Sequence, residues 1–195
     1  MQKKIILLYN FAQLVYCYLI CRLSCIIHSK NRILKRLFII RHAKSDQGFF
    51  GNDFERPLSE RGKSDAPVMA KRLKGKQFKI DALISSPAKR AKKTAEIFVE
   101  TFGNSTDEIV LISSLYQAPV ELFYEVVSAL PDTLHSVALF SHNPGITYFV
   151  NSLQTEAQID NMPTCAIFAV EMDIKQWSGF TKAKKGFLFF DYPKK

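Results

Sequence analysis

The sequence is poor in cysteine outside its N-terminal end. Of four cysteines, only Cys165 lies beyond residue 33, while Cys17, Cys21 and Cys25 are spaced four residues apart. This spacing places the three on one stripe of a helix, but no histidine or acidic residue is positioned to complete a metal site with them. A disulfide framework is therefore excluded, and a reducing compartment, the cytoplasm, is expected.

Three features of common catalytic sites are also missing. The chain has no glycine-rich phosphate loop, no cluster of carboxylates suited to Mg²⁺, and no cysteine in a reactive setting. These absences exclude P-loop nucleotide enzymes, magnesium sites built on carboxylates, and cysteine nucleophiles. We therefore expect neither a metal nor another cofactor.

Acidic residues are absent from the first 36 residues, which carry seven Lys or Arg. The formal net charge of +9 comes mostly from this segment, because residues 37–195 hold 20 basic and 18 acidic side chains, a net of +2. A surplus this small is not the basic footprint that nucleic-acid binding requires. Nucleic acid is therefore not expected as a partner.

Residues 1–33 need a separate interpretation as a hydrophobic N-terminal extension. Ile5–Cys21 is a mostly apolar run of 17 residues, at the short limit for a membrane-spanning helix. It is long for a secretory signal, and no small-residue cleavage site follows it. If it inserts, the positive flank Arg22–Arg36 would hold the rest of the chain in the cytoplasm as a membrane-tethered domain. Alternatively, translation starts at Leu34 and the extension is a start-site artefact, so a membrane is a partner only if the extension is real.

From residue 34 to residue 195 the sequence predicts one α/β domain. Short apolar runs alternate with helical patterns, and the connections are short with no internal repeat. Helices should therefore cover both faces of a mostly parallel central sheet, giving a three-layer sandwich. Strands are predicted at Leu37–Ile40, Asp81–Ser85, Ile109–Ile112, Ser136–Phe140, Cys165–Met172 and Gly186–Tyr192, and helices at 59–73, 86–102, 119–130 and 144–153.

Two helix starts carry specific expectations. Ser59 should cap the first helix, but Pro67 lies inside it, so we expect a kink at the proline or a start nearer Asp65. Ser86 should cap the second helix, with Pro87 in the first turn. Each of these helices then follows a strand and a polar cluster.

Basic and imidazole side chains follow the predicted strands. Arg41 and His42 end the first strand, and His142 ends the fourth. Arg90 lies one turn into the second helix, and Arg56 closes the loop after the first strand. Ligands bind at the carboxyl ends of the strands in an open α/β sheet, so these five groups should meet in one crevice. Three guanidinium groups and two imidazoles beside helix N-termini suit a tetrahedral dianion, and without a metal a histidine is the economical nucleophile.

Four linked motifs resemble those of the histidine phosphatase superfamily and, within it, the short SixA-type phosphohistidine phosphatases. The motifs are Arg41-His42-Ala43-Lys44-Ser45, the segment 53–62 with Arg56-Pro57-Leu58-Ser59, the segment 85–95 with Ser85-Ser86-Pro87 and Arg90-Ala91, and Ser141-His142-Asn143-Pro144-Gly145. They occur in the family's order. The resemblance implies a phosphoglycerate-mutase-like fold, and a metal-independent phosphatase domain over residues 34–195.

The resemblance also implies a role for each side chain. His42 would be the nucleophile that takes the phosphoryl group, as a phosphohistidine intermediate. The phosphoryl oxygens would be bound and neutralised by Arg41, Arg56, Arg90 and His142. Lys44 and Ser45 follow the nucleophile directly and are further candidates for contact with the phosphate or its leaving group. The guanidinium field should lower the pKa of His42 and keep the ring neutral.

The glutamate general acid that larger members carry in an inserted segment is not found in this sequence. Asp53 is the carboxylate best placed to donate a proton, while Glu121 and Glu125 are weaker candidates. An imidazole leaving group, with a pKa of about 6.5, needs far less help from an acid than an alkoxide does. We therefore expect a phosphatase that acts on phosphohistidine in a protein. The alternatives are a phosphatase of a small phosphomonoester, and a catalytically idle module that binds a phosphorylated ligand.

Overall fold

The structure is a computed structural model and describes residues 34–103 and 108–194. The predicted N-terminal extension, residues 1–33, lies outside the described residues. The structure therefore tests neither its interpretation as a membrane anchor nor its interpretation as a start-site artefact. Within the ranges that are described, no helix has both the length and the apolar character needed to cross a membrane.

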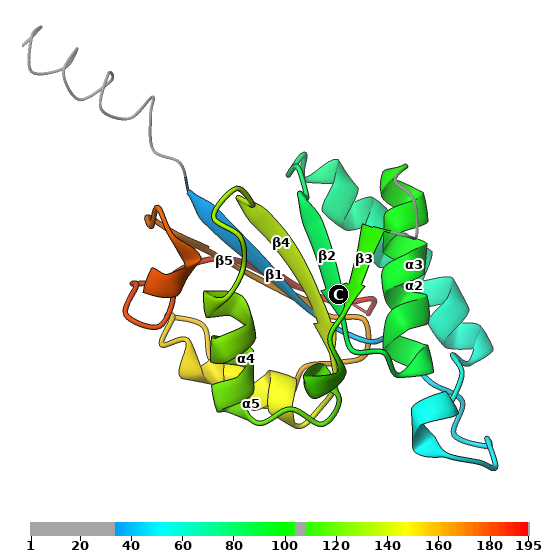
Figure 1. The fold of residues 1–195 in the computed structure, drawn as a ribbon. Helices are drawn as coiled ribbons and strands as arrows, with labels where there is room; N and C mark the ends of the chain where they lie inside the picture. Colours follow the sequence, from blue (N-terminus) through cyan, green and yellow to red (C-terminus); the bar gives the residue numbers. More distant parts are fainter. Residues whose placement is uncertain (1–33, 104–107, 195) are drawn as a thin grey trace, which may run out of the picture. The chain divides into compact units, whose positions relative to one another are not determined.

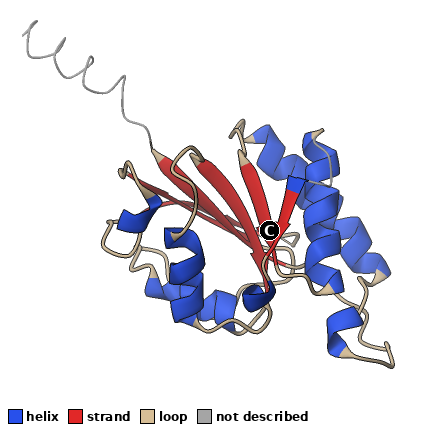
Figure 2. Cartoon of the chain, in the orientation of Figure 1, coloured by secondary structure: helices blue, strands red, loops and turns tan. Residues whose placement is uncertain are grey.

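The core of the domain is a six-stranded sheet with the order β3-β2-β4-β1-β5-β6 (Figures 1 and 2). β3, β2, β4 and β1 run parallel to one another, whereas β5 is antiparallel to β1 and β6 is antiparallel to β5. The prediction of a mostly parallel sheet is therefore confirmed. The strands are β1 Lys35–Arg41, β2 Ala82–Ser85, β3 Ile109–Leu111, β4 Ser136–Ser141, β5 Ile167–Met172 and β6 Gly186–Asp191.

Helices cover both faces of this sheet, as Figure 1 shows for α2 and α3 on one side and α4 and α5 on the other. Strand residues alternate between the two faces. Leu37 and Ile39 belong to the core under α4 and α5, while Phe38 and Ile40 belong to the core under α2 and α3. The three-layer prediction is confirmed. The helices are α2 Glu60–Gly75, α3 Lys89–Phe102, α4 Val120–Ser128 and α5 Gly145–Ser152, with 3-10 turns η1 Asp53–Glu55, η3 Ser113–Leu115 and η4 Trp177–Gly179.

Helix α2 begins where its capping residue predicts. The Ser59 side chain accepts a hydrogen bond from the Gly62 amide, and the helix continues through Pro67. The alternative start nearer Asp65 is therefore wrong. Pro67 leaves the Lys63 carbonyl without a helix hydrogen bond, but Lys63 is exposed, so water can replace the missing donor.

The predicted start of α3 is wrong by two to three residues. Ala88 is the N-cap, and no side chain caps the helix. Ser86 lies two residues before that cap, where its hydroxyl accepts a hydrogen bond from the Ala88 amide at 3.3 Å. The Ser-Pro pattern that favours a cap therefore reflects a turn in which Ser86 is buried next to a histidine.

Candidate active site

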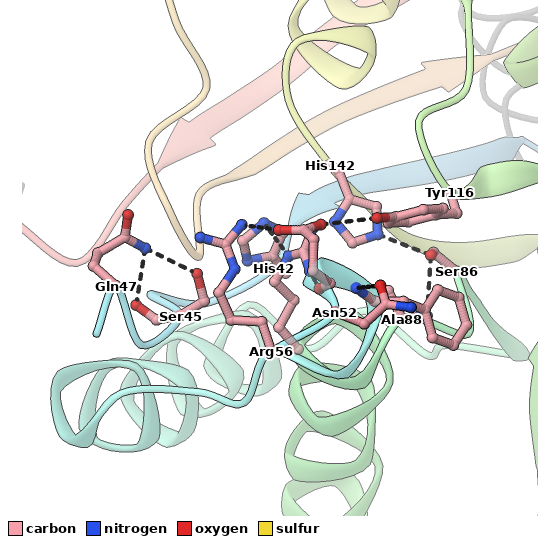
Figure 3. Close-up of polar contacts among 12 residues, drawn as sticks. His42, Ser45, Gln47, Asn52, Arg56, Ser86, Ala88, Tyr116 and His142 are labelled. Carbon is pink, nitrogen blue, oxygen red and sulfur yellow. Dashed lines mark hydrogen bonds and ion pairs between the residues drawn. The ribbon is translucent and has the colours of Figure 1, made fainter. Parts of the chain in front are cut away.

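The candidate site lies at the carboxyl ends of the two central strands. β1 and β4 are parallel neighbours with Arg41 beside Ser141, so His42 and His142 leave the sheet side by side. Their ring centroids are 5.0 Å apart. A cavity of about 180 Å³ adjoins them, lined by Arg41, His42, Lys44, Ser45, Gln47, Arg56, Arg90, His142, Asn143 and Thr164. Figure 3 shows His42 and Arg56 in this cavity, with Ser45 and Gln47 on one side and His142 and Tyr116 on the other.

Hydrogen bonds fix the neutral tautomer of His42. Its Nδ1 is 2.7 Å from the Ala43 carbonyl oxygen, which can only accept, so Nδ1 carries the hydrogen. Its Nε2 accepts a hydrogen bond from Nε of Arg90 at 3.3 Å, and a guanidinium can only donate. Nε2 is therefore the unprotonated nitrogen of the ring, and its lone pair becomes available to attack phosphorus when the contact with Arg90 is released.

The segment that follows His42 is held from two sides. The Ala43 amide donates to the Thr94 hydroxyl at 3.0 Å, and that hydroxyl donates to the Arg90 carbonyl oxygen at 2.7 Å. On the other side the Ser59 amide donates to the Lys44 carbonyl oxygen at 2.9 Å. A Cβ on Gly62 would lie 2.0 Å from the same carbonyl oxygen, so only glycine allows this close approach.

Three arginines surround the cavity, and protein groups hold each of them. Arg41 donates from Nη1 to the Met162 carbonyl oxygen at 2.7 Å. Arg90 donates from Nη2 to Asp53 Oδ2 at 2.8 Å, and Arg56 forms an ion pair with Asp53 Oδ1. The Nε atoms of Arg41 and Arg56 are buried without a hydrogen-bond partner among the described residues. An anion that reached these two donors would displace no existing hydrogen bond.

The second histidine is oriented by a serine. Nε2 of His142 is 2.8 Å from the Ser86 hydroxyl, which is itself buried. The Tyr116 ring packs edge-on against His142, with a centroid distance of 5.4 Å, and its hydroxyl donates to Asp53 Oδ2 at 2.8 Å. Nδ1 of His142 is buried and has no partner among the described residues. The serine therefore leaves one nitrogen of this ring free for a ligand.

Burial and nearby positive charge keep both histidines neutral. Burial lowers the pKa of His42 well below its usual range, as do the electrostatic interaction with His142 and the charges of Arg90 and Arg41, against the opposing effect of the bond to Ala43. The expected direction of this shift is confirmed, although burial rather than the guanidinium field is its largest cause. Burial and then the charge of Arg90 lower the pKa of His142 to about 3.

Asp53 binds the arginines but does not line the cavity. Burial acts to raise its pKa, but hydrogen bonds from Tyr116 and Arg90 and the charges of Arg90 and Arg56 lower it overall. The carboxyl group is therefore ionised at neutral pH in the free protein. Its role as proton donor stays a prediction. Glu121 and Glu125 are exposed on α4 and are absent from the residues that line the cavity.

The other predicted site residues all line the cavity. They are Arg41, His42, Lys44, Ser45, Arg56, Arg90 and His142. Sequence reasoning missed the site roles of three further residues. Ser86 and Thr94 lie inside a quoted motif and could have been found there, whereas nothing in the sequence around Tyr116 connects it to Asp53, 63 residues away.

Groups of His, Cys, Asp or Glu that could hold a metal ion do not occur in residues 34–103 and 108–194. Cys165 is free and buried, and burial raises the pKa of its thiol well above its usual range. A thiol that stays protonated is a poor nucleophile. His42 and His142 are both neutral and each has one unprotonated ring nitrogen, and for His42 the hydrogen bonds identify that nitrogen as Nε2.

Comparisons with known proteins agree with this site. Residues 37–115 match the model of the Histidine phosphatase superfamily (branch 1). The phosphohistidine phosphatase SixA of Escherichia coli is 29% identical over 139 residues, which cover 71% of this chain and 86% of SixA.

Two solved structures have the same fold. One is the protein histidine phosphatase SixA complexed with tungstate, which is 26% identical, with a TM-score of 0.70 over 82% of this chain and 97% of that one. The other is a protein of Agrobacterium tumefaciens provisionally named phosphohistidine phosphatase SixA, 25% identical, with a TM-score of 0.70 over 82% of this chain and 98% of that one. The predicted phosphoglycerate-mutase-like fold and the resemblance to SixA-type proteins are both confirmed.

Proposed function

We propose that the chain removes phosphate from phosphohistidine in a protein, with His42 as nucleophile and without a metal. The comparisons support a place in the histidine phosphatase superfamily, in its SixA-type branch, and therefore a phosphatase activity. The observation that carries this proposal is the unprotonated Nε2 of His42 beside three arginines. The relative that was solved with tungstate supports it, since tungstate is a tetrahedral oxyanion like phosphate.

The proposed reaction has two steps. In the first, His42 Nε2 attacks the phosphorus of a phosphohistidine whose other ring nitrogen is protonated, the bond from phosphorus to the substrate nitrogen breaks, and a neutral imidazole leaves with the electron pair of that bond. In the second, water attacks phosphorus, the bond from phosphorus to His42 breaks, and inorganic phosphate leaves. The hydrogen bond from His42 Nδ1 to the Ala43 carbonyl oxygen stabilises the positive charge that the ring gains during attack.

Positive charge around the cavity stabilises the transferring group. Arg41, Arg56 and Arg90 face it, and Nδ1 of His142 is free to donate when Ser86 donates to Nε2. Such preorganised donors stabilise charge that grows on the phosphoryl oxygens in the transition state. Lys44 and Ser45 also line the cavity and are proposed to contact the phosphoryl group or the leaving group.

The state of Asp53 favours a substrate with a good leaving group. This carboxylate is ionised, pairs with Arg56 and Arg90, and accepts a hydrogen bond from Tyr116. Among the described residues, the free protein therefore holds no protonated carboxyl group next to the cavity. Imidazole, with a pKa of about 6.5, leaves readily without a strong acid. A phosphohistidine fits this site better than an alkyl phosphate, whose alkoxide needs a proton.

The same ionised Asp53 favours one other candidate, an idle module that binds a phosphorylated ligand without turnover. The test is release of phosphate from a histidine-phosphorylated protein, and from the aryl phosphate p-nitrophenyl phosphate, in the presence of EDTA. The proposal expects turnover of the phosphoprotein by the wild-type chain and none by His42→Ala. Release by the wild type no faster than by His42→Ala, together with retained binding of the phosphoprotein, would establish the idle module instead.

A further inference from the structure

A second concave surface lies beside the catalytic cavity, where the starts of α2 and α3 meet. This groove has a volume of about 350 Å³, and Pro57 and Leu58 form its floor. Its rim carries the four lysines Lys63, Lys89, Lys92 and Lys93. Leu58 is 5% exposed and Pro57 is half-buried, and lysine stems add apolar surface around them. The groove is thus apolar inside and positively charged at its edge.

Acidic residues neutralise only part of this charge. Lys63 pairs with Glu60 at 2.6 Å, and Lys93 pairs with Glu96, which also lines the groove, at 3.0 Å. Lys89 and Lys92 are exposed and have no acidic partner among the described residues. The rim therefore presents two unneutralised ammonium groups, on the exposed side of the helix that carries Arg90.

Neighbouring residues of the chain line the groove and the catalytic cavity. Arg56 lines the cavity, and the next residue, Pro57, lines the groove. In the same way Lys89 lines the groove and Arg90 lines the cavity. A ligand with its phosphoryl group against Arg56 and Arg90 could therefore extend over Pro57 and between the lysines. A small metabolite that fits in a cavity of about 180 Å³ would not reach this surface.

We propose that the groove binds the chain of the phosphorylated protein substrate, through an acidic segment in which one apolar side chain sits on Pro57 and Leu58. This inference rests on the proposed phosphohistidine phosphatase function and names the partner of that site. Complementary charge at the edge of an interface raises the association rate and fixes the register of the partner. The apolar floor supplies the buried contact that a purely charged surface lacks.

The test compares substrates that differ only beside the phosphohistidine. One synthetic peptide carries phosphohistidine flanked by a leucine and two glutamates, and the second has glutamines in place of the glutamates. The third substrate is p-nitrophenyl phosphate, which is too small to span the groove. The protein variant is Lys89→Glu/Lys92→Glu, and a matched charge reversal far along the chain, Lys182→Glu/Lys184→Glu, serves as control. A glutamate at position 89 is compatible with the first turn of α3 because acidic residues are favoured there.

The groove proposal expects a specific pattern of kcat/KM. For the glutamate peptide, kcat/KM should fall about tenfold or more in the Lys89→Glu/Lys92→Glu variant and stay within twofold in the control. Values for the glutamine peptide and for p-nitrophenyl phosphate should change less than about threefold in both. The wild-type preference for the glutamate peptide should also weaken as salt is added.

Two results would overturn the groove proposal. One is an equal fall for all three substrates, which would mean that the lysines act on the catalytic cavity itself. The other is no loss on the glutamate peptide, which would mean that the groove is not used. Failure of the proposed function looks different, since the wild-type chain would then turn over neither peptide.

Discussion

Two positively charged cavities of the described residues, the catalytic one and a second one, differ in how their charges are held. In the catalytic cavity the guanidinium and imidazole groups are largely buried, and backbone carbonyls, Ser86 and Asp53 orient them. The second cavity, of about 310 Å³, is larger and is lined by Lys182, Lys184 and Lys185, together with Tyr124, Ser152, Leu153, Gln154, Thr181 and Ala183. Lys182 and Lys184 are exposed.

Lys185 shows why the second cavity is not a comparable anion site. Its side chain is buried, its amine donates to the Thr181 carbonyl oxygen at 3.2 Å, and it lies over the rings of Tyr124 and Phe180 at 5.6 and 4.8 Å. This ammonium group serves local packing, and burial lowers its pKa. Lysine-rich runs usually form solvated faces, but the side chain of Lys185 is buried.

The difference between the cavities lies in preorganisation and not in the amount of positive charge. Exposed lysines lose side-chain entropy when they close on an anion, and water screens them. Buried arginines that are already oriented lose little, and their field is strong because water is excluded. The predictions below test this contrast by removing oriented groups from one cavity and mobile groups from the other.

The largest effect is expected for His42→Ala. Removing the proposed nucleophile should lower kcat on a phosphohistidine peptide by on the order of 10⁴-fold or more. The paired change Lys182→Ala/Lys184→Ala in the other cavity should leave kcat within about twofold. Single-turnover phosphate release measures both. Comparable losses in the two variants would remove the distinction between the cavities.

Arg90→Ala should cost about a hundredfold in kcat/KM, because it removes an oriented donor from the phosphoryl group and the partner of His42 Nε2. Arg90→Lys keeps a charge but cannot reach His42 and Asp53 together, so it should recover only part of the loss. A loss below about threefold in Arg90→Ala would mean that Arg90 does not contact the transferring group.

Ser86→Ala should lower kcat roughly tenfold with little change in KM, since it frees the His142 ring without removing a positive charge. Ser86→Thr keeps the hydroxyl and should restore most of the rate. NMR titration of the His142 ring adds a readout that a general loss of stability would not move, because loss of the serine hydroxyl should change which ring nitrogen carries the hydrogen. The same spectrum in wild type and Ser86→Ala would contradict this role.

The smallest effect concerns stability in acid. The unfolded state binds protons on histidine below a pKa of about 6.5, whereas His142 stays neutral in the folded state down to about 3. Stability should therefore fall as the pH drops through this window. Between about pH 7.5 and pH 5, His142→Gln should lose about 2 kcal/mol less than the wild type, as measured by urea unfolding. Asp53 does not alter this expectation, because the pKa of its carboxyl is lowered from an ordinary value of about 3.9 and its contribution is lost only below about pH 5. Parallel pH dependence in the two proteins would contradict a neutral, buried His142.

Local patterns in the sequence determined the strands, the helices, their order, and seven of the residues that line the cavity. Apolar alternation and the Ser59 cap depend on neighbours a few residues away, so they can be read from the chain. Strand ends that carry Arg41, His42 and His142 were enough to predict one anion site, because parallel strands bring their carboxyl ends to the same edge.

Tertiary structure decided how these groups are oriented and protonated. The bond between Arg90 and His42 joins residues 48 positions apart, that between His142 and Ser86 joins residues 56 apart, and Tyr116 reaches Asp53 over 63. Hydrogen-bond geometry and burial depend on which surfaces pack together, and no local pattern encodes them. For this reason the sequence led to a serine cap and an acid at Asp53, while the fold places Ser86 on His142 and ionises Asp53 between two arginines.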